Sequence, residues 1–429
     1  MGSNQPKGKR ISADGLAGRF VAEWVNGPVI PFYISLVLYL SSILVSNILW
    51  DFFWNDFQDF FVYLSGAAAA SCYIIILHRM SRSPWMYLVY AAGSIIMLRF
   101  ASILVPASLI LMAAGKDFRN IPKAYLFVIL FWTAVAGLGQ LFHYCAPYVA
   151  DDYLKTEAYG FCMSFGYRHP NIFAQYILAA CLCVWYLWLQ RERALTFLLF
   201  WLSAVFVWFL MKSRTGFIML AGFPFLALLL LFAADRDRKP SEHPVRKKIW
   251  YGFLIGLPFI LLAFSLVMAV HMEGLVRLFK DSVLWNFFSR FVAGGVALKL
   301  YGIHLFGSEI DFSGDTGMWF GPILIVLTCL DNAYLSALVK RGVIAALVKL
   351  GGLSLINVKC SRDRNYSLLL ISVFLQLGAV METYPVNFSC NFAFLYLLCT
   401  PVLCQPPAKA DYIPLRQAIK DSRKSQKAI

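Results

Sequence analysis

Cations and hydroxyl groups occur together in the stretch KSRTG at residues 212–216, between two long apolar runs. Arg214 suits a phosphate because the planar guanidinium group donates two parallel hydrogen bonds and stays protonated. Lys212 would add charge, and the hydroxyl groups of Ser213 and Thr215 would add donors beside the amides that begin the next helix. This stretch therefore predicts an anion-binding site. The alternative is an ordinary loop whose cations reach lipid headgroups.

A second guanidinium group could complete a clamp on the same anion. Arg290, in the stretch FFSRF, is the strongest candidate, and Arg277 and Arg341 are weaker ones. Guanidinium groups fixed around a phosphate stabilise the negative charge that develops on it, without needing a metal ion. The alternative for Arg290 is a cation that lies at the membrane surface and has no further role.

Polar residues also mark the start of a helix in the stretch GYRHPNIFAQY, residues 166–176. Pro170 suits the first helical turn, so Arg168, His169 and Asn171 are expected at the mouth of that helix. His169 could orient a sugar hydroxyl group or accept a proton near neutral pH. The alternative is that His169 and Asn171 only cap the helix.

Two acidic residues complete the set of candidates. Asp331 precedes Asn332 in the stretch LDNAYL, where a long loop returns to a helix. Asp331 could act as a general base toward a sugar hydroxyl group, or it could serve as the N-cap of that helix. Glu382 is expected at the C-terminal end of a helix, where an anion is unfavourable. Its position therefore predicts a partner such as an arginine.

The composition is that of a membrane protein. Of the 429 residues, 60% are hydrophobic and 14% are charged, and the mean hydropathy is +0.67. Long apolar runs without the alternation of barrel strands predict membrane-spanning helices. The net charge of +15 does not indicate nucleic acid, because the cytoplasmic loops of membrane proteins are basic anyway. The ten cysteines lack metal-ligand spacing, so neither a metal nor a cofactor is predicted.

Charge counting predicts a topology for an all-α polytopic membrane protein. With residues 1–28 and the basic tail 405–429 in the cytoplasm, most of the 38 Lys and Arg residues fall in inner segments. Residues 29–404 then form one transmembrane domain with two large outer loops, 142–169 and 271–331, so the protein is expected to work on the outer side. The prediction is about 12 helices, at 29–49, 60–77, 84–98, 99–115, 121–141, 170–190, 195–211, 216–234, 249–270, 332–356, 366–382 and 388–404.

Some segments fit this plan poorly. Residues 84–114 are short for two spans, and the apolar run 318–330 is too short for one, although it could dip into the membrane. The helix predicted at 332–356 carries three cations at membrane depth, which is costly unless they face a cavity. These cations are Lys340, Arg341 and Lys349. Apolar residues at helical spacing over 275–291 predict an amphipathic helix that lies at the outer membrane surface and carries Arg277 and Arg290.

Taken together, these blocks resemble the Wzy-type O-antigen and capsular polysaccharide polymerases, which are relatives of the O-antigen ligases. The resemblance covers roughly residues 30–404 and rests on the order, spacing and common outer placement of short motifs. The motifs are GYRHPN at 166–171, KSRTG at 212–216, SRF at 289–291 with LFG at 305–307, LDNAYL at 330–335 with Gly342, and Glu382 before Asn391. The resemblance implies a membrane-embedded glycosyltransferase of the C type. It also implies a donor glycan on undecaprenyl pyrophosphate, at the outer face of a bacterial cytoplasmic membrane, and no nucleotide sugar.

The resemblance also implies roles for the candidate residues. The hydroxyl group of a second lipid-linked repeat unit would attack the anomeric carbon, and Arg214 and Arg290 would hold the departing pyrophosphate. The general base stays open between Asp331 and His169. The ligases carry a His-containing motif where this chain has Asp331, which favours a polymerase for O-antigen, capsule or exopolysaccharide. The candidate substrate-binding residues are Lys212, Arg168, Asn171, Thr215, Asn332, Tyr334, Arg341 and Glu382.

Two alternative functions stay open. An O-antigen-ligase-type transferase would accept an acceptor other than a repeat unit. A transporter or flippase for lipid-linked sugars would need charged groups deep inside helices and access from both faces. The candidate groups are expected at one face, with Lys349 as the exception, and this favours chemistry over transport. The expected partners are undecaprenyl-pyrophosphate-linked oligosaccharides, membrane lipid, and a chain-length regulator and flippase of the same pathway, with no nucleic acid.

Overall fold

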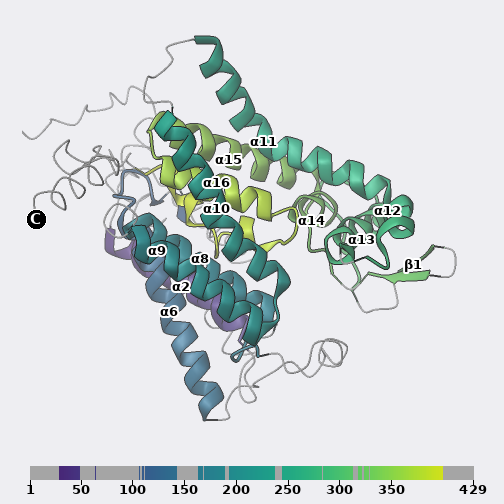
Figure 1. The fold of residues 1–429 in the computed structure, drawn as a ribbon, viewed down its shortest axis with the longest axis horizontal. Helices are drawn as coiled ribbons and strands as arrows, with labels where there is room; N and C mark the ends of the chain where they lie inside the picture. The colour runs from purple at the N-terminus through teal and green to yellow at the C-terminus, as the bar shows by residue number, and fades with distance from the viewer. Residues whose placement is uncertain are drawn as a thin grey trace, which may run out of the picture.

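The computed structural model describes residues 29–48, 63, 106, 109–110, 112–142, 163–167, 169–188, 193–236, 244–282, 284–312, 317–320, 323–327 and 329–399. These residues are mostly helical (Figure 1), and five of their helices are long and apolar enough to cross a membrane. The five are Asn120–Leu141, Pro170–Trp188, Ala194–Met211, Lys248–Val270 and Gly342–Arg362. The chain is therefore a helical membrane protein. The N-terminal segment, the basic tail and the predicted helix 84–98 lie outside the described residues, as do most of the predicted helices 60–77 and 99–115 and most of the loop 142–169.

Three helices that are separate in the sequence form a bundle. They are α2 (Val29–Ser46), α6 (Asn120–Leu141) and α8 (Pro170–Trp188), and α6 packs on both of the others. At one end of the bundle, the Asn47 side-chain amide donates a hydrogen bond to the Tyr176 hydroxyl group at 3.0 Å. This bond joins the last turn of α2 to the first turns of α8. We call this end of the molecule the site end.

The KSRTG stretch forms the turn between two antiparallel helices. α9 (Arg193–Phe206) continues as a π-helical turn, η2 (Val207–Met211), and the chain then reverses into α10 (Arg214–Arg236). Lys212 makes the reversal with a left-handed backbone, at φ 52°. The turn lies at the site end, because Ser213 is hydrogen-bonded to the first turn of α8. The boundary between the two apolar runs is thus a tight turn, as the sequence predicts.

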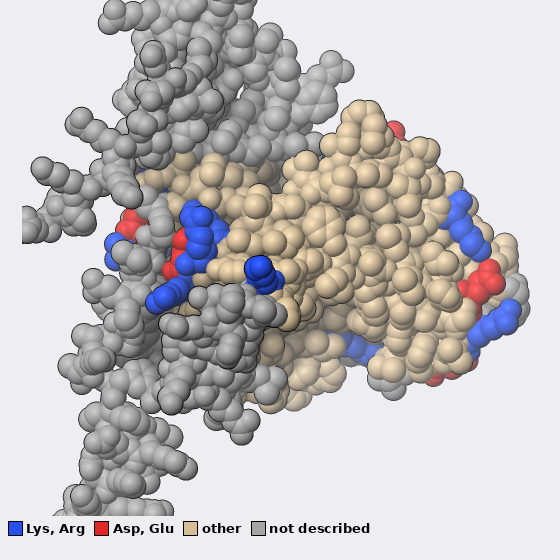
Figure 2. All heavy atoms as spheres, turned by 90° about the horizontal axis from the view of Figure 1, so that it is seen from above, with Lys and Arg blue, Asp and Glu red and all other residues tan. Residues whose placement is uncertain are grey.

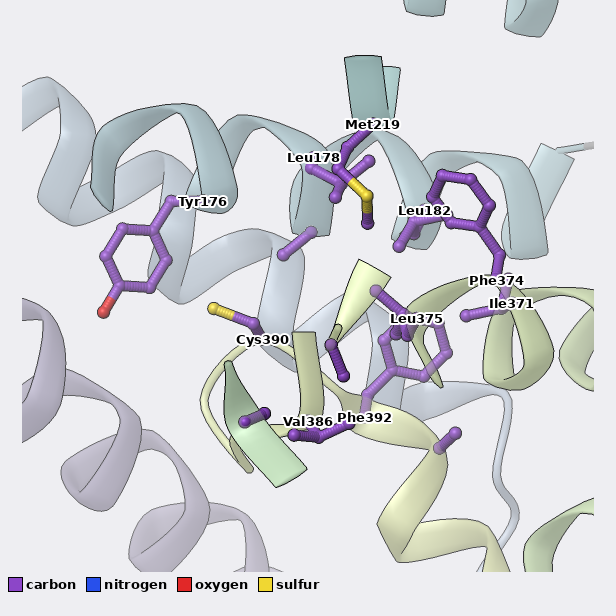
Figure 3. Packing of buried hydrophobic residues seen from close by; sticks show 14 of the residues in the cluster. Tyr176, Leu178, Leu182, Met219, Ile371, Phe374, Leu375, Val386, Cys390 and Phe392 are labelled. Carbon is purple, nitrogen blue, oxygen red and sulfur yellow. The ribbon is translucent and has the colours of Figure 1, made fainter. Parts of the chain in front are cut away.

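An apolar core fills the space between α8, α10 and α16 (Tyr366–Gly378). Figure 3 shows Leu182 and Met219 opposite Phe374, with Phe392 packed on the other side of the same core. In a membrane, lipid tails are as apolar as these side chains, so such contacts stabilise the fold through close packing rather than through exclusion of water.

Beyond the bundle, α11 (Pro244–Val270) runs to the site end, where α12 (Met272–Phe279) and α13 (Trp285–Tyr301) follow it (Figure 1). The apolar side of α12 is buried against α13, and the rings of Phe279 and Phe288 stack at 3.9 Å. The single amphipathic helix expected at the membrane surface is therefore two helices. The apolar pattern of α12 reflects packing against protein, not against lipid.

The apolar run 318–330 contains a short β-hairpin. β1 (Gly317–Phe320) pairs antiparallel with β2 (Ile323–Val326), and Gly317 lies opposite Val326. Trp319 is exposed on this hairpin. The hairpin departs from the all-α prediction, and it shows that the run needs no membrane span of its own.

The helix predicted at 332–356 is broken. α14 (Ala333–Lys340) ends at the break and α15 (Gly342–Arg362) begins there, because Gly342 has a left-handed backbone with φ 89°. Lys340 and Arg341 are therefore exposed beside the break, not inside a continuous helix. This corrects the expectation that both cations lie within a helix at membrane depth.

A segment of chain, residues 303–308, occupies the break, and we call it the strap. The Ile344 amide donates a backbone hydrogen bond to the Leu305 carbonyl oxygen at 3.3 Å. Gly307 and Gly342 both have positive φ, and their backbones meet so closely that a Cβ on Gly342 would lie 2.5 Å from the Leu305 carbonyl oxygen. The LFG motif and Gly342, far apart in the sequence, thus form one backbone contact.

The C-terminal part departs from two predicted helices, 366–382 and 388–404. α16 already ends at Gly378, and the chain continues as two 3₁₀ helices, η3 (Tyr384–Val386) and η4 (Phe392–Leu397). The proline within η3 has no N–H to continue an α-helix. As a result, Glu382 stands in a connecting segment beyond the helix end.

Charge is distributed as expected for a protein that crosses a membrane. Figure 2 shows Lys, Arg, Asp and Glu gathered toward the two ends of the described part, with few on the broad face between them. A face of that kind is stable against lipid tails, whereas charged groups there would be costly. The predicted outer loops both reach the site end, because Met163 is backbone-bonded to Leu210 and Arg290 reaches Thr215.

Candidate functional site

Arg290 is the centre of a polar cluster at the site end. Its Nη2 donates hydrogen bonds to the Thr215 Oγ1 at 2.9 Å and to the Glu382 Oε1 at 3.1 Å. Its Nη1 donates to the Asn286 carbonyl oxygen, and its Nε lies 3.8 Å from the Asp331 Oδ2. Side chains from four stretches of sequence, between residues 215 and 382, thus meet at one guanidinium group. The partner predicted for Glu382 is Arg290.

Close packing of α13 sets the position of this guanidinium group. One turn beyond Arg290, Gly294 lies so near α14 that a Cβ there would overlap the Leu335 side chain. The next residue, Gly295, has equally little room against the Ala269 carbonyl oxygen at the end of α11. With α13 held against two helices, the Arg290 side chain has a fixed origin from which to reach α10 and the segment after α16.

The cluster is partly closed to solvent. The side chains of Glu382, Arg290 and Asp331 are 4%, 11% and 36% exposed. Burial raises the pKa of Glu382 to about 7, against the opposing effect of Arg290 and with a further increase from Asp331. The Glu382 carboxyl group therefore changes charge near neutral pH, whereas Asp331 forms the open side of the cluster.

The donors of Arg290 are largely committed. A guanidinium group has five N–H bonds, and here both of those on Nη2 and one on Nη1 have acceptors on Thr215, Glu382 and Asn286. The Nε is buried and has no hydrogen-bond partner among the described residues. A phosphate oxygen could accept hydrogen bonds from the remaining donors. A phosphate that bound through the Nη2 donors as well would have to displace Glu382 or Thr215 from them.

Asp331 and Asn332 have different surroundings although they are neighbours. Asn332 is the N-cap of α14, and its Oδ1 accepts from the amides of Tyr334 and Leu335 at 3.0 Å. Asp331 is therefore not the N-cap, and its carboxylate is left for the Arg290 cluster. This outcome excludes the capping alternative for Asp331.

Two predicted substrate-binding residues are used by the fold. The buried Asn332 amide donates to the Ser265 hydroxyl group at 3.0 Å, and the buried Tyr334 hydroxyl group donates to the Gln376 carbonyl oxygen at 2.8 Å. Both side chains join α14 to its neighbours, α11 and α16. The structure places them in the core, not on a surface that a ligand could reach.

The N-terminal ends of α8 and α10 are joined by a hydrogen bond beside the cluster. The Ser213 hydroxyl group donates to the Asn171 Oδ1 at 2.7 Å and accepts from the Gly216 amide at 3.2 Å. The His169 Nδ1 accepts from the Asn171 amide at 3.0 Å. In the neutral ring this leaves the proton on Nε2, so His169 is arranged as a donor there rather than as a base. Arg168 lies outside the described residues.

Replacement of Ser213 with Ala is expected to lower the free energy of unfolding by about 1 kcal/mol, because a helix N-cap is lost. The bond to Asn171 is lost with it. Thermal unfolding of the purified protein in detergent would measure the change. Ser289→Ala is the matched control, since the half-buried Ser289 hydroxyl group donates to a backbone carbonyl oxygen of its own helix, that of Asn286. Equal midpoints for the two variants would contradict the capping role.

The other predicted cations are distributed around this region. Lys212 is exposed at the turn, and Arg214, half-buried, opens α10 next to Thr215. Arg341 is exposed at the α14–α15 break, and Arg277 is exposed on α12. Among the described residues, no ion pair joins Arg341 or Arg277 to the Arg290 cluster. The structure thus brings Thr215, Arg290, Asp331 and Glu382 together but not the two weaker arginine candidates.

A buried polar network beneath the cluster was not predicted. The Asn357 Oδ1 accepts from the Ser372 hydroxyl group at 2.8 Å and from the Gln376 Nε2 at 2.9 Å. Ser372 and Gln376 are four residues apart in an otherwise apolar helix, which is the pattern of interhelical hydrogen bonding in membranes. That spacing is the signal that could have revealed the network. Its groups are satisfied by one another, which indicates a structural role.

Comparisons with known proteins add no relative: no family model, no curated protein and no solved structure matches this chain. Within the described ranges, no group of three or more His, Cys, Asp or Glu residues is arranged to hold a metal ion.

Proposed function

We propose that this protein is a membrane glycosyltransferase that polymerises undecaprenyl-pyrophosphate-linked oligosaccharide repeat units into O-antigen, capsule or exopolysaccharide. The observation that carries the proposal is the largely enclosed Arg290, bonded to Thr215 and Glu382 and facing Asp331 at the site end. The proposed setting is the outer face of a bacterial cytoplasmic membrane. A flippase and a chain-length regulator of the same pathway would be its partners.

The proposed reaction is a displacement at an anomeric carbon. The acceptor hydroxyl group forms the new glycosidic bond, the bond from that carbon to the lipid pyrophosphate breaks, and the electron pair leaves with the pyrophosphate. Negative charge grows on the leaving group, where a fixed guanidinium group stabilises it more in the transition state than in the ground state. Arg290 is already fixed by three acceptors, and Arg214 and Lys212 would add charge from the start of α10.

Asp331 is the better candidate for the general base. Its carboxylate is partly open to solvent, and its neighbour Asn332 performs the capping that would otherwise occupy it. His169 accepts a hydrogen bond through Nδ1, which favours a donor role at Nε2. A proton lost by the acceptor hydroxyl group would pass to Asp331, whose Oδ2 lies 3.8 Å from the Arg290 Nε.

The two alternative functions are a ligase, which differs from the polymerase in its acceptor, and a transporter, which moves its substrate through the membrane. A ligase would use an acceptor other than a repeat unit. A transporter would need charge along a path through the membrane, and Lys349, half-buried within α15, is a residue of that kind. The Arg290 cluster, by contrast, joins groups from four segments at one end. This convergence favours a reaction centre over a transport path.

The direct test of the proposal is the glycan made by cells that lack the gene and carry either the wild type or a variant. Asp331→Asn keeps the size of the side chain but removes the base. The proposal predicts single lipid-linked repeat units with Asp331→Asn and long chains with the wild type, at matched amounts of protein in the membrane. Long chains with the variant would exclude Asp331 as the base, and long chains in the empty deletion strain would exclude the proposed function.

The affinity for the donor is expected to depend on Glu382. Above its pKa of about 7, ionised Glu382 competes with an anionic ligand for Arg290, and below that pKa the competition falls. The donor diphosphate is a diester whose charge does not change in this range. The KM for lipid-linked donor should therefore fall, by up to about tenfold, between about pH 8 and about pH 6 in the wild type.

Two matched variants test whether the pH dependence of the KM arises from Glu382 or from another titrating group. Glu382→Gln should give a KM that is nearly flat with pH, because the neutral amide has no proton to gain. Glu273→Gln, which alters an exposed carboxylate paired with Lys299, should keep the wild-type profile. A pH dependence that survives Glu382→Gln would assign it to another group.

A further inference from the structure

The strap, residues 303–308, carries exposed apolar side chains. Leu305 and Phe306 are exposed on it, as is Ile303 at its start. The strap is not a free loop, because backbone hydrogen bonds and the Gly307–Gly342 contact fix it in the α14–α15 break. Its apolar side chains are thus held outward by rigid backbone. A soluble protein rarely exposes a cluster of apolar side chains unless another molecule covers it.

The exposed apolar surface of the strap continues along a candidate membrane span. α15 begins at the break and is long and apolar enough to cross a membrane. Its outward residues Ile344, Leu347 and Val348 are exposed apolar side chains, as expected where lipid covers a helix. The Ile344 amide donates a hydrogen bond to the Leu305 carbonyl oxygen, so the exposed surface of the strap adjoins the exposed surface of α15.

Two cations mark the place where these surfaces meet. Lys340 and Arg341 are exposed at the break, and within the described part of the chain no ion pair joins either one to a carboxylate. Lys340 lies 5.4 Å from the centre of the Phe312 ring. Cations and aromatic rings beside the end of an apolar span are typical of the membrane surface, where cations reach the phosphates of lipid headgroups.

The exposed surface of α12 has the opposite character. Leu278 is 74% exposed there, close to the 79% of Phe306, but it is surrounded in sequence by charged, exposed residues. These are Glu273, Arg277 and Lys280. The same degree of exposure therefore occurs in two settings, one apolar and continuous with the exposed face of α15, the other among charged residues.

We propose that the strap is a membrane anchor that lies in the lipid headgroup region, with Phe306 and Leu305 against the acyl chains and Lys340 and Arg341 on anionic phospholipid headgroups. The anchor fixes the depth of the α14–α15 break in the bilayer. Because Asp331 precedes α14 directly, the same anchor sets the depth of the Arg290 cluster at the membrane surface. The inference does not depend on the reaction that the cluster performs.

Photo-crosslinking of the full chain to lipid tests the position of the strap. The photoreactive residue p-benzoylphenylalanine would replace Phe306, Val348 or Leu278 in turn, in nanodiscs of phosphatidylcholine and phosphatidylglycerol. Val348, 71% exposed within α15, reports lipid contact, and Leu278 reports a charged surface of equal exposure. We expect lipid adducts at position 306 within about twofold of those at 348 and roughly tenfold above those at 278. Adducts at 306 as rare as at 278 would overturn the proposal.

The headgroup contact has its own test. Native mass spectrometry would count the phosphatidylglycerol molecules retained by the wild type, by Lys340→Gln/Arg341→Gln and by Arg277→Gln/Lys280→Gln. The first pair should lose retained anionic lipid and the second pair should not. Equal retention by both pairs would exclude a headgroup site at the break. Displacement of the retained lipid from the wild type by inorganic phosphate would instead assign the two cations to a free anion and overturn the anchor.

Discussion

Replacement of Arg290 with Ala is expected to slow chain extension by roughly 10²–10³-fold, the usual effect of removing one fixed donor from a developing anion. The guanidinium group also neutralises Glu382, so its loss leaves a buried carboxyl group without a counter-ion. Arg290→Lys should recover little, because a lysine cannot reach Thr215, Glu382 and a phosphate at the same time. Glycan length in complemented deletion cells, with variant protein matched in the membrane, would measure both variants.

Arg277→Ala is the matched control for this prediction. Arg277 belongs to the same long segment between α11 and α14, but it is exposed on α12 and outside the Arg290 cluster. Its removal should leave chain length unchanged. Normal chains with Arg290→Ala, or short chains with both variants, would show that the cluster is not the centre of the reaction.

Gly342→Ala is expected to destabilise the folded protein strongly. A side chain in the left-handed backbone of Gly342 costs about 1–3 kcal/mol, and its Cβ would also lie 2.5 Å from the Leu305 carbonyl oxygen. The contact is backbone against backbone, so neither side can rotate away, and the strap would have to leave the break. The yield of monodisperse protein after detergent extraction and the midpoint of thermal unfolding should both fall.

Gly351→Ala tests whether this loss is specific to the break. Gly351 belongs to the same helix as Gly342, but no atom lies within 4 Å of a Cβ built on it. Because alanine favours a helix over glycine by up to about 1 kcal/mol, this variant should be as stable as the wild type or more so. A stable Gly342→Ala variant would mean that the strap does not pack in the break as described.

The types of residue in the site predicted that Glu382 is paired with a cation, but they did not predict where the helices begin and end. Glu382 has the cationic partner that was expected, Arg290, although it lies beyond the end of α16 and not at a helix C-terminus. The reason is that a buried charge leaves few solutions, so the type and rough position of a residue are enough to predict its partner. The sequence could not show which of the outer arginines that partner would be, because the choice depends on how α13 packs against α11 and α14.

The break between α14 and α15 was hidden from the sequence for a different reason. The stretch 332–356 is mostly apolar, and a glycine such as Gly342 within it is compatible with a continuous helix. What breaks the helix is the strap, whose Gly307 meets Gly342 from 35 positions away in the chain. Likewise, helical spacing of apolar residues predicted the α12 face but could not tell whether lipid or α13 covers it.

The most direct measurement of the proposed function uses the substrate that accumulates when the protein is missing. Lipid-linked oligosaccharide would be extracted from deletion cells and given to the purified wild-type protein in proteoliposomes, without nucleotide sugar. We predict glycans of several repeat units on the lipid carrier, with release of free undecaprenyl pyrophosphate, and no product with Arg290→Ala. Single repeat units that stay unchanged with the wild type, or that only move across the bilayer, would contradict the account.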